Sequence, residues 1–308
     1  MPMPIPMSCP MRGWFCRVRA ATGRCVRWPT ISFGKWPCPE AACRIGKGGR
    51  RRNALMQIID GIQKFTDKFE GENFEYRRKR RALAEELQKP DFWDPIDNFG
   101  LLAGEQTIAR AMAMFELVKL SAGTPGHIAE FGVWNGNNLL LVAKLLRLLQ
   151  PNTYKHLYGF DSFVGLTDVT EKDTRDPSAA SHGQYQGMYK GDRARLERMI
   201  SFFGYEEWVH LVVGDARETI PAFADRHPNV MLSMAILDFD LYEPTKAALG
   251  FVHDRILPGG LVVFDEAMSQ AWAGEGTAAV EFLREYGHLY ETGHIPFSRM
   301  PTMYLRRK

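Results

Sequence analysis

Two groups of carboxylate side chains are spaced so that they can act together. Asp238 and Asp240 follow one short apolar run, and Asp265 and Glu266 follow the next, at residues 234–237 and 261–264. Such runs are typical of strands buried in a parallel sheet, and ligands bind where those strands end. With no excess of Lys or Arg nearby, the acids would repel one another unless a cation or a shared proton intervened. Oxygen ligands in this number suit Mg²⁺ or Ca²⁺, which favours a metal site over a structural hydrogen-bond network.

A glycine-containing turn lies upstream of both acid groups, with the sequence Glu-Phe-Gly-Val-Trp-Asn-Gly at 130–136. It follows an apolar run and precedes a helical pattern. Glycine is needed at such a turn because the chain reverses there and a nucleotide-like ligand approaches the backbone closely. A dinucleotide fingerprint requires glycine at the position of Trp134, so the sequence disfavours a nicotinamide-dependent oxidoreductase.

Acidic residues also end the two strands expected next along the chain. Asp161 and Ser162 end the second strand, where a carboxylate can accept hydrogen bonds from the hydroxyls of a ribose. Asp215 ends the third strand, where it can receive an adenine amino group. Each has a simpler alternative, because Asp and Ser are also common in turns and as helix N-caps. An acid at three successive strand ends nevertheless favours a nucleotide-like cofactor.

The elements that must position these residues alternate between strand and helix. The period-2 and apolar runs predict strands at 127–133, 156–162, 209–215, 232–239 and 259–265. Helices are expected before and between them, at 106–120, 137–149, 191–203, 217–225 and 243–255. The alternation predicts an α/β fold with a doubly wound parallel sheet, closed by a C-terminal antiparallel hairpin at 293–298 and 302–306. We divide the chain into an extension at 1–55, an N-terminal helical segment at 56–125 and the main domain at 126–308.

One long polar stretch, 167–190, interrupts the alternation. It contains Gly, Ser, Tyr and His without periodicity, which is typical of a lid or a binding loop. His182 lies within it, and a single histidine in such a loop is more often a surface residue than a catalyst.

The first 55 residues differ from the rest in composition. They hold eleven basic residues, one acid and all five cysteines, whereas the remaining chain holds 28 basic and 35 acidic residues. A transit peptide, a basic arm and translated sequence upstream of a start at Met56 are all consistent with this segment. The mildly acidic, thiol-free body argues against a nucleic-acid partner and against a disulfide-built secreted fold. No apolar stretch is long enough for a membrane span, so we expect a cytoplasmic enzyme.

Together these residues resemble the class I S-adenosylmethionine-dependent methyltransferases, and among them the macrocin O-methyltransferase family. The resemblance covers about residues 100–305 and is most specific in the block from Leu237 to Thr245. It implies a Rossmann-like, seven-stranded methyltransferase sheet. It also implies Mg²⁺ or another divalent cation, held here by Asp238, Asp265 and Glu266, with Asp240 as the general base. The family has an Asp-Asp pair where this chain has Asp265-Glu266, a change that lengthens one ligand.

The same resemblance assigns a set of residues to S-adenosylmethionine: Glu130, Gly132, Gly136, Asp161, Ser162, Asp215 and Ala216. We therefore expect a metal-dependent O-methyltransferase that acts on a hydroxyl of a small molecule, with a sugar or a glycosylated natural product as the favoured acceptor. The alternatives are a metal-independent or catechol-type methyltransferase and a non-enzymatic nucleotide-binding scaffold. A homo-oligomer is possible.

Overall fold

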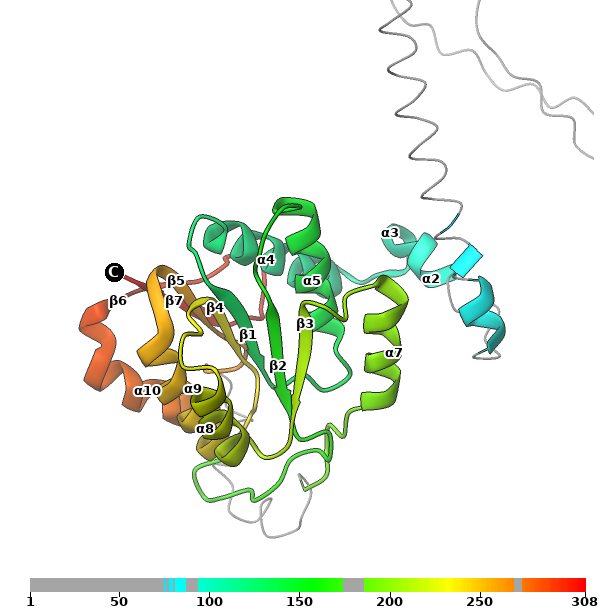
Figure 1. The fold of residues 1–308 in the computed structure, drawn as a ribbon. Helices are drawn as coiled ribbons and strands as arrows, with labels where there is room; N and C mark the ends of the chain where they lie inside the picture. The colour runs from blue at the N-terminus through cyan, green and yellow to red at the C-terminus, as the bar shows by residue number, and fades with distance from the viewer. Residues whose placement is uncertain (1–74, 76–77, 80, 87–93, 174–185, 269–272) are drawn as a thin grey trace, which may run out of the picture. The chain divides into compact units, whose positions relative to one another are not determined.

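The computed structural model describes residues 75, 78–79, 81–86, 94–173, 186–268 and 273–308 (Figure 1). All of them belong to the second of two units into which the chain divides, Gly71–Lys308. The expectations for the extension at 1–55 and for His182 lie outside the described residues.

Within the described residues, one seven-stranded sheet has the order β3-β2-β1-β4-β5-β7-β6. Its strands in chain order are β1 (His127–Phe131), β2 (Leu157–Asp161), β3 (Val209–Val213), β4 (Leu232–Leu237), β5 (Ile256–Phe264), β6 (Tyr290–Gly293) and β7 (Met303–Arg307). Neighbouring strands from β3 to β5 are parallel, whereas β7 is antiparallel to both β5 and β6. The chain order reverses between β1 and β4, so β1 and β4 flank the switch point where ligands bind in such sheets.

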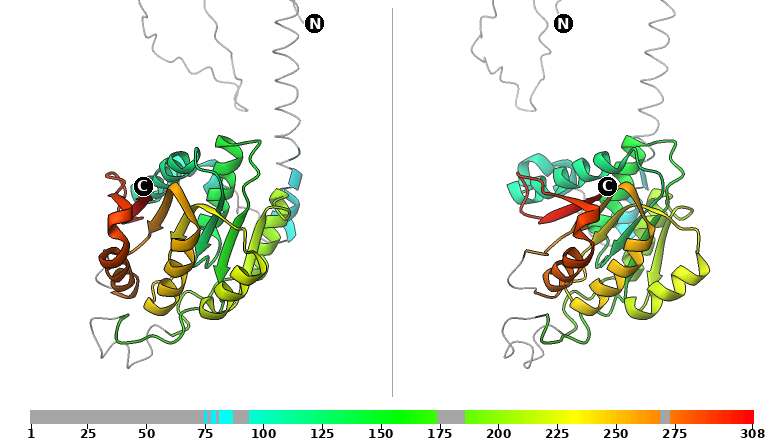
Figure 2. Two further views of the ribbon diagram at one scale, coloured as in Figure 1. Left: turned by 60° about the vertical axis from the view of Figure 1, so that its left-hand side comes forward. Right: turned by 90° about the vertical axis from the view of Figure 1, so that its left-hand side faces the viewer.

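Helices cover both faces of this sheet (Figure 2). On one face, α4 (Glu105–Ser121), α5 (Asn137–Leu149) and α7 (Arg193–Phe203) share a core with residues such as Ile128 and Met234. On the other, α8 (Ala216–Arg226), α9 (Tyr242–Arg255) and α10 (Ala273–Tyr286) pack against alternate residues such as Ala129 and Ala235. All six residues of β4 are buried, as expected for a central strand covered on both faces. The predicted doubly wound α/β fold is confirmed.

The short helices α2 (Asp94–Asp97) and α3 (Phe99–Leu102) precede α4, and the 3₁₀ helix η3 (Gly287–Leu289) leads into β6. None of the described helices is long and apolar enough to cross a membrane.

The structure corrects the sequence-based elements near the C-terminus. The hairpin is present, but its first strand is β6 at Tyr290–Gly293 and not 293–298. Pro296 lies in the predicted run and has no N–H to donate to a neighbouring strand, which is consistent with the strand ending earlier. The helix α10 was not predicted at all, although Ala278 and Phe282, four residues apart, are buried on one face.

Candidate active site

The four acids identified from the sequence line one cavity at the carboxyl ends of β4 and β5. The cavity measures about 310 Å³, and its lining includes Asp238, Asp240, Asp265 and Glu266 together with Glu130 from β1. We refer to it as the acid cavity. The strand predicted at 232–239 ends earlier, at Leu237, and Asp240 beyond it has a left-handed φ of 63°. A tight turn, and not strand alternation, therefore brings Asp238 and Asp240 to the same cavity.

Burial makes the charged forms of these acids costly. It raises the pKa of Asp240 to about 7, with further contributions from the charges of Glu266 and Asp265. Burial likewise raises the pKa of Glu130 to about 8. The hydrogen bond that Asn138 Nδ2 donates to Glu130 Oε1 at 3.1 Å acts in the opposite direction and lowers this pKa. Burial and the nearby carboxylates of Asp265 and Asp240 raise the pKa of Asp238 well above its ordinary value. Without a cation in the cavity, these carboxyl groups therefore cannot all be ionised together at neutral pH.

One basic side chain lies in the acid cavity, and the sequence did not identify it. Arg110 of α4 reaches Asp265 with two nitrogens, Nη1 to Oδ2 at 3.0 Å and Nη2 to Oδ1 at 2.9 Å. The same Nη2 lies 3.5 Å from Asp238 Oδ2. Desolvation opposes the charge of Arg110, but its attraction to Asp265 and Asp238 outweighs that effect and raises the pKa of the guanidinium. The sequence showed no excess of Lys or Arg near these acids, and it did not identify Arg110, which comes from a distant helix.

A sixth carboxylate beside these five acids comes from the unpredicted helix α10. Glu275 is fully buried, and its Oε1 accepts a hydrogen bond from the backbone N–H of Glu266 at 2.9 Å. Its own backbone N–H donates to the carbonyl of Asp240 at 3.3 Å. Burial raises the pKa of Glu275 well above its ordinary value. Glu275 thus ties the ends of two strands together, and no motif in the sequence marked it.

The chemistry of these donors fits a hard divalent cation, because all are carboxylate oxygens. Two buried oxygens, Glu130 Oε2 and Glu275 Oε2, have no hydrogen-bond partner among the described residues. The arrangement is not that of a ready metal centre, however: in the part of the chain that the structure describes, no three His, Cys, Asp or Glu side chains are grouped to hold a metal ion. Arg110 lies between two of the predicted ligands.

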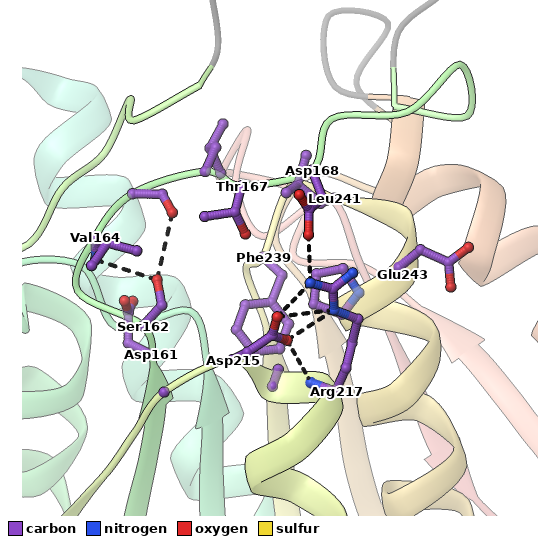
Figure 3. A pocket seen from close by; sticks show the side chains of 15 residues that line it. Asp161, Ser162, Val164, Thr167, Asp168, Asp215, Arg217, Phe239, Leu241 and Glu243 are labelled. Atoms are coloured by element: carbon purple, nitrogen blue, oxygen red, sulfur yellow. Dashed lines mark hydrogen bonds and ion pairs between the residues drawn. The ribbon is translucent and has the colours of Figure 1, made fainter.

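A second and larger cavity, of about 480 Å³, lies at the ends of β2, β3 and β4 (Figure 3). Its walls combine apolar groups with acids, and they include Asp161, Ser162, Asp215 and Ala216 of the predicted cofactor set. We refer to it as the nucleotide-side cavity. Phe239 and Leu241 line it, whereas Asp238 and Asp240 line the acid cavity. The four-residue segment 238–241 therefore forms a shared wall, with alternate residues facing alternate cavities.

Asp161 holds the glycine turn in place. Its Oδ2 accepts hydrogen bonds from the backbone N–H groups of Val133 and Trp134, both at 2.7 Å, and its Oδ1 accepts one from Phe163 at 2.6 Å. Trp134 and Phe163 both have left-handed φ angles, of 49° and 56°. The carboxylate thus stabilises two strained turns that border the cavities.

For Asp215 the sequence allowed two roles, a contact to the cofactor or a helix N-cap. It is the N-cap of α8, and its Oδ1 accepts a hydrogen bond from the Arg217 backbone N–H at 2.9 Å. The Arg217 guanidinium also pairs with Asp215, through Nε at 3.0 Å, and with Asp168 at 2.5 Å (Figure 3). These hydrogen bonds with Arg217 lower the pKa of Asp215. Ala216 follows as the first residue of α8.

The two glycines of the predicted set are required by packing in the protein itself. A Cβ on Gly132, whose φ is 98°, would overlap the backbone carbonyl oxygen of Asp238. A Cβ on Gly136, with φ 77°, would overlap the side chain of Leu196 on α7. Gly132 thus lets β1 and the acid-bearing turn approach each other, a reason that the sequence alone did not reveal.

Two aromatic side chains, which sequence reasoning did not assign, also line the acid cavity. Trp134 and Tyr189 are 47% and 43% exposed, and their rings meet edge to face with centroids 6.0 Å apart. Desolvation raises the pKa of Tyr189, and so do the charges of Asp240, Glu266 and Asp238. An apolar ring surface therefore adjoins the acids on the side that solvent reaches.

The chain is similar to a known protein family. The family described as Macrocin-O-methyltransferase (TylF) matches residues 50–291, more than half of the chain. The chain is 28% identical over 149 residues to the 8-demethyl-8-(2,3-dimethoxy-alpha-L-rhamnosyl)-tetracenomycin-C 4'-O-methyltransferase of Streptomyces olivaceus, covering 48% of this chain and 55% of that protein. It is 27% identical over 145 residues to the demethyldecarbamoylnovobiocin O-methyltransferase of Streptomyces niveus, covering 47% and 53%. The chain thus spans about half the length of these curated relatives.

Among solved structures, the calicheamicin methyltransferase CalS11 superposes with a TM-score of 0.61 at 30% sequence identity. The superposition covers 77% of this chain and 92% of that one. The O-methyltransferase NovP, at 24% identity and a TM-score of 0.54, shares the fold.

Proposed function

The chain belongs to the macrocin O-methyltransferase family, and from this premise we propose that it transfers the methyl group of S-adenosylmethionine to a hydroxyl of a glycosylated small molecule. The observation that carries the proposal is the shared wall at 238–241. Because its residues alternate between the nucleotide-side cavity and the acid cavity, a cofactor in the first would meet an acceptor in the second beside Asp240.

We assign the nucleotide-side cavity to the cofactor. Its size and its apolar walls at Phe239 and Leu241 suit an adenine ring, and the strand ends supply Asp161 and Ser162 for the ribose. Gly132, Gly136 and Glu130 would border the methionine part, with Asp215 and Ala216 at the adenine end. When bound, the sulfonium supplies an already activated methyl group, so the protein has to orient the acceptor and remove one proton.

Asp240 is our candidate for the general base. It is 9% exposed and lies between Phe239 and Leu241, which line the nucleotide-side cavity. The Glu275 backbone N–H donates a hydrogen bond to its carbonyl. A carboxylate in this position can accept the proton of an acceptor hydroxyl as the oxygen attacks the methyl carbon.

The proposal also includes a divalent cation in the acid cavity. Asp238, Asp265 and Glu266 would hold it, and when bound it would supply positive charge that lowers the pKa of the acceptor hydroxyl. The support is the all-oxygen donor set and the surplus of acid in the cavity. The metal-independent alternative also has a specific observation in its favour, because Arg110 already neutralises part of that charge.

The acceptor class is supported by the rim of the acid cavity and by the relatives. A sugar presents apolar C–H faces and hydroxyls together, which matches exposed rings at Trp134 and Tyr189 beside carboxylates. The named relatives include methyltransferases of a rhamnosylated tetracenomycin and of calicheamicin.

The test is methyl transfer by the purified full chain with methyl-labelled S-adenosylmethionine and a panel of glycosides and their aglycones. We expect label on a sugar hydroxyl of at least one glycoside and none on the matching aglycone. Parallel reactions with EDTA and with added Mg²⁺ separate the metal-dependent form from the metal-independent one. Transfer to catechols alone would overturn the acceptor class, and cofactor binding without transfer to any acceptor would favour a scaffold.

A further inference from the structure

Arg110 reaches the acid cavity because of its place on α4. The residues of α4 that are buried include Ala113, Met114, Leu117 and Ser121. Arg110 precedes Ala113 and Met114 by three and four residues, so it continues the same buried face one turn toward the N-terminus. That turn lies at the edge of the sheet where the acid-bearing strands end, and the guanidinium is directed at them.

The pairing is specific in geometry. Arg110 binds both carboxylate oxygens of Asp265, one with each terminal nitrogen, and its Nη2 also lies 3.5 Å from Asp238 Oδ2. Such a bidentate pair fixes the planar guanidinium more firmly than a single contact would. Asp265 is 5% exposed at its side chain, whereas Arg110 and Asp238 are 29% and 27% exposed, so Arg110 has a route to solvent.

The single positive charge of Arg110 does not neutralise the carboxylates of the acid cavity. Arg110 is the single basic residue among the described residues that line it, while five acids do so. The buried oxygens Glu130 Oε2 and Glu275 Oε2 have no partner in the described chain. A second cation would therefore be attracted, but at Asp238 and Asp265 it would meet the guanidinium, and like charges at that distance repel strongly in a buried site.

We propose that Arg110 is the resident cation of the acid cavity and that it competes with a divalent metal ion for Asp238 and Asp265. The two cations bind these carboxylates alternately, and a metal ion enters only when the Arg110 side chain leaves toward solvent. The inference rests on the acid cavity of the proposed function, but it concerns cation binding and not methyl transfer.

The experiment is Mn²⁺ binding to the full chain, stripped with EDTA and followed by electron paramagnetic resonance without cofactor or acceptor. We expect Arg110→Gln to lower the dissociation constant for Mn²⁺ by about tenfold or more relative to the wild type. Arg110→Lys, which keeps the charge but not the fork, should give a smaller decrease. Asp265→Asn combined with Arg110→Gln should weaken the binding again.

The matched control is Arg193→Gln, because Arg193 is an exposed arginine paired with Glu197 at 2.8 Å outside the cavity. We expect this variant to bind Mn²⁺ as the wild type does. Circular dichroism and calorimetry with S-adenosylhomocysteine show whether each variant is folded. If Arg110→Gln does not fold, the Mn²⁺ comparison is made with Arg110→Lys. A folded Arg110 variant that binds Mn²⁺ no more tightly than the wild type would overturn the competition. Failure of methyl transfer would leave this measurement unaffected.

Discussion

The carboxylate of Asp173 accepts a hydrogen bond from the backbone N–H of Tyr242 at 2.5 Å, although 69 residues separate them. Tyr242 begins α9, whose own N-cap residue, Leu241, provides no side-chain cap. Asp173 therefore caps the helix that follows the turn at 238–241. Its backbone carbonyl also accepts a hydrogen bond from Ala273, the first residue of α10, at 3.2 Å. One buried residue thus joins the starts of two helices beside the acid cavity.

We expect Asp173→Ala to lower the free energy of unfolding by about 1 kcal/mol or more, the usual cost of a lost N-cap. Urea unfolding of the full chain measures the change. Glu171→Ala, a substitution of an exposed neighbour, should leave stability within experimental error of the wild type. Equal stability of Asp173→Ala and Glu171→Ala would show that the cap contributes nothing.

The parallel part of the sheet was predictable from the sequence because its signals are local. Apolar runs such as 234–237 and 261–264 are contiguous and are followed by acids, so a strand and its functional end are visible together. The family was identified from these strand ends together with the glycine turn, and the block at 237–245 was the most specific part. Gly132 was marked correctly as a position that needs glycine, but its closest neighbour is the protein's own chain at Asp238.

The partners of the acids were not predictable, because they come from elements far away in the chain. Arg110 is 155 residues from Asp265, and it resembles any charged residue of an amphipathic helix until α4 is placed on the sheet. Glu275 was missed together with α10, whose Gly274 and Gly276 weaken the helical signal. Spacing within one segment carries no information on such contacts.

Asp240→Asn should slow methyl transfer by about 10²–10⁴-fold, the usual loss for a general base, while cofactor binding is retained. The amide is similar in size but cannot accept the proton from the acceptor hydroxyl. Single-turnover rates and calorimetry with S-adenosylhomocysteine separate the two effects. Asp225→Asn, on the exposed surface of α8, is the control and should react as the wild type does. An unchanged rate in Asp240→Asn would remove Asp240 from the mechanism.

Asp161→Ala should lower both stability and cofactor affinity. Three backbone N–H groups, those of Val133, Trp134 and Phe163, would lose their acceptor, which we expect to cost about 1–3 kcal/mol in unfolding free energy. Asp161→Asn keeps one acceptor oxygen, and we expect it to retain the two bonds made by Oδ2 and to be less damaging. Urea unfolding and calorimetry with S-adenosylhomocysteine measure both effects. If the alanine and asparagine variants behave alike, the hydrogen bonds to the turn are not what Asp161 contributes.

A histidine cluster on the sheet predicts how stability depends on pH. His127, His156 and His210 lie side by side on β1, β2 and β3 or next to them, and His156 Nδ1 is 2.8 Å from His210 Nε2. Burial first, and then the neighbouring His156, lower the pKa of both His127 and His210. The unfolded chain therefore binds protons at these sites more readily than the folded one. Their contribution to stability is complete above the unfolded pKa of about 6.5 and is lost as pH falls toward the folded values.

Replacing His210 by asparagine isolates this contribution from that of the buried carboxylates. The raised pKa values of Glu130 and Asp240 act in the opposite direction, since they favour folding at low pH and their effect is lost as pH rises. Urea unfolding at several pH values between 5 and 8 should give His210→Asn a weaker fall in stability below pH 6.5 than the wild type. His288→Asn, in the 3₁₀ helix η3 and outside the cluster, should keep the wild-type pH dependence. Parallel pH curves for His210→Asn and the wild type would show that the cluster does not bind protons differently in the folded and unfolded states.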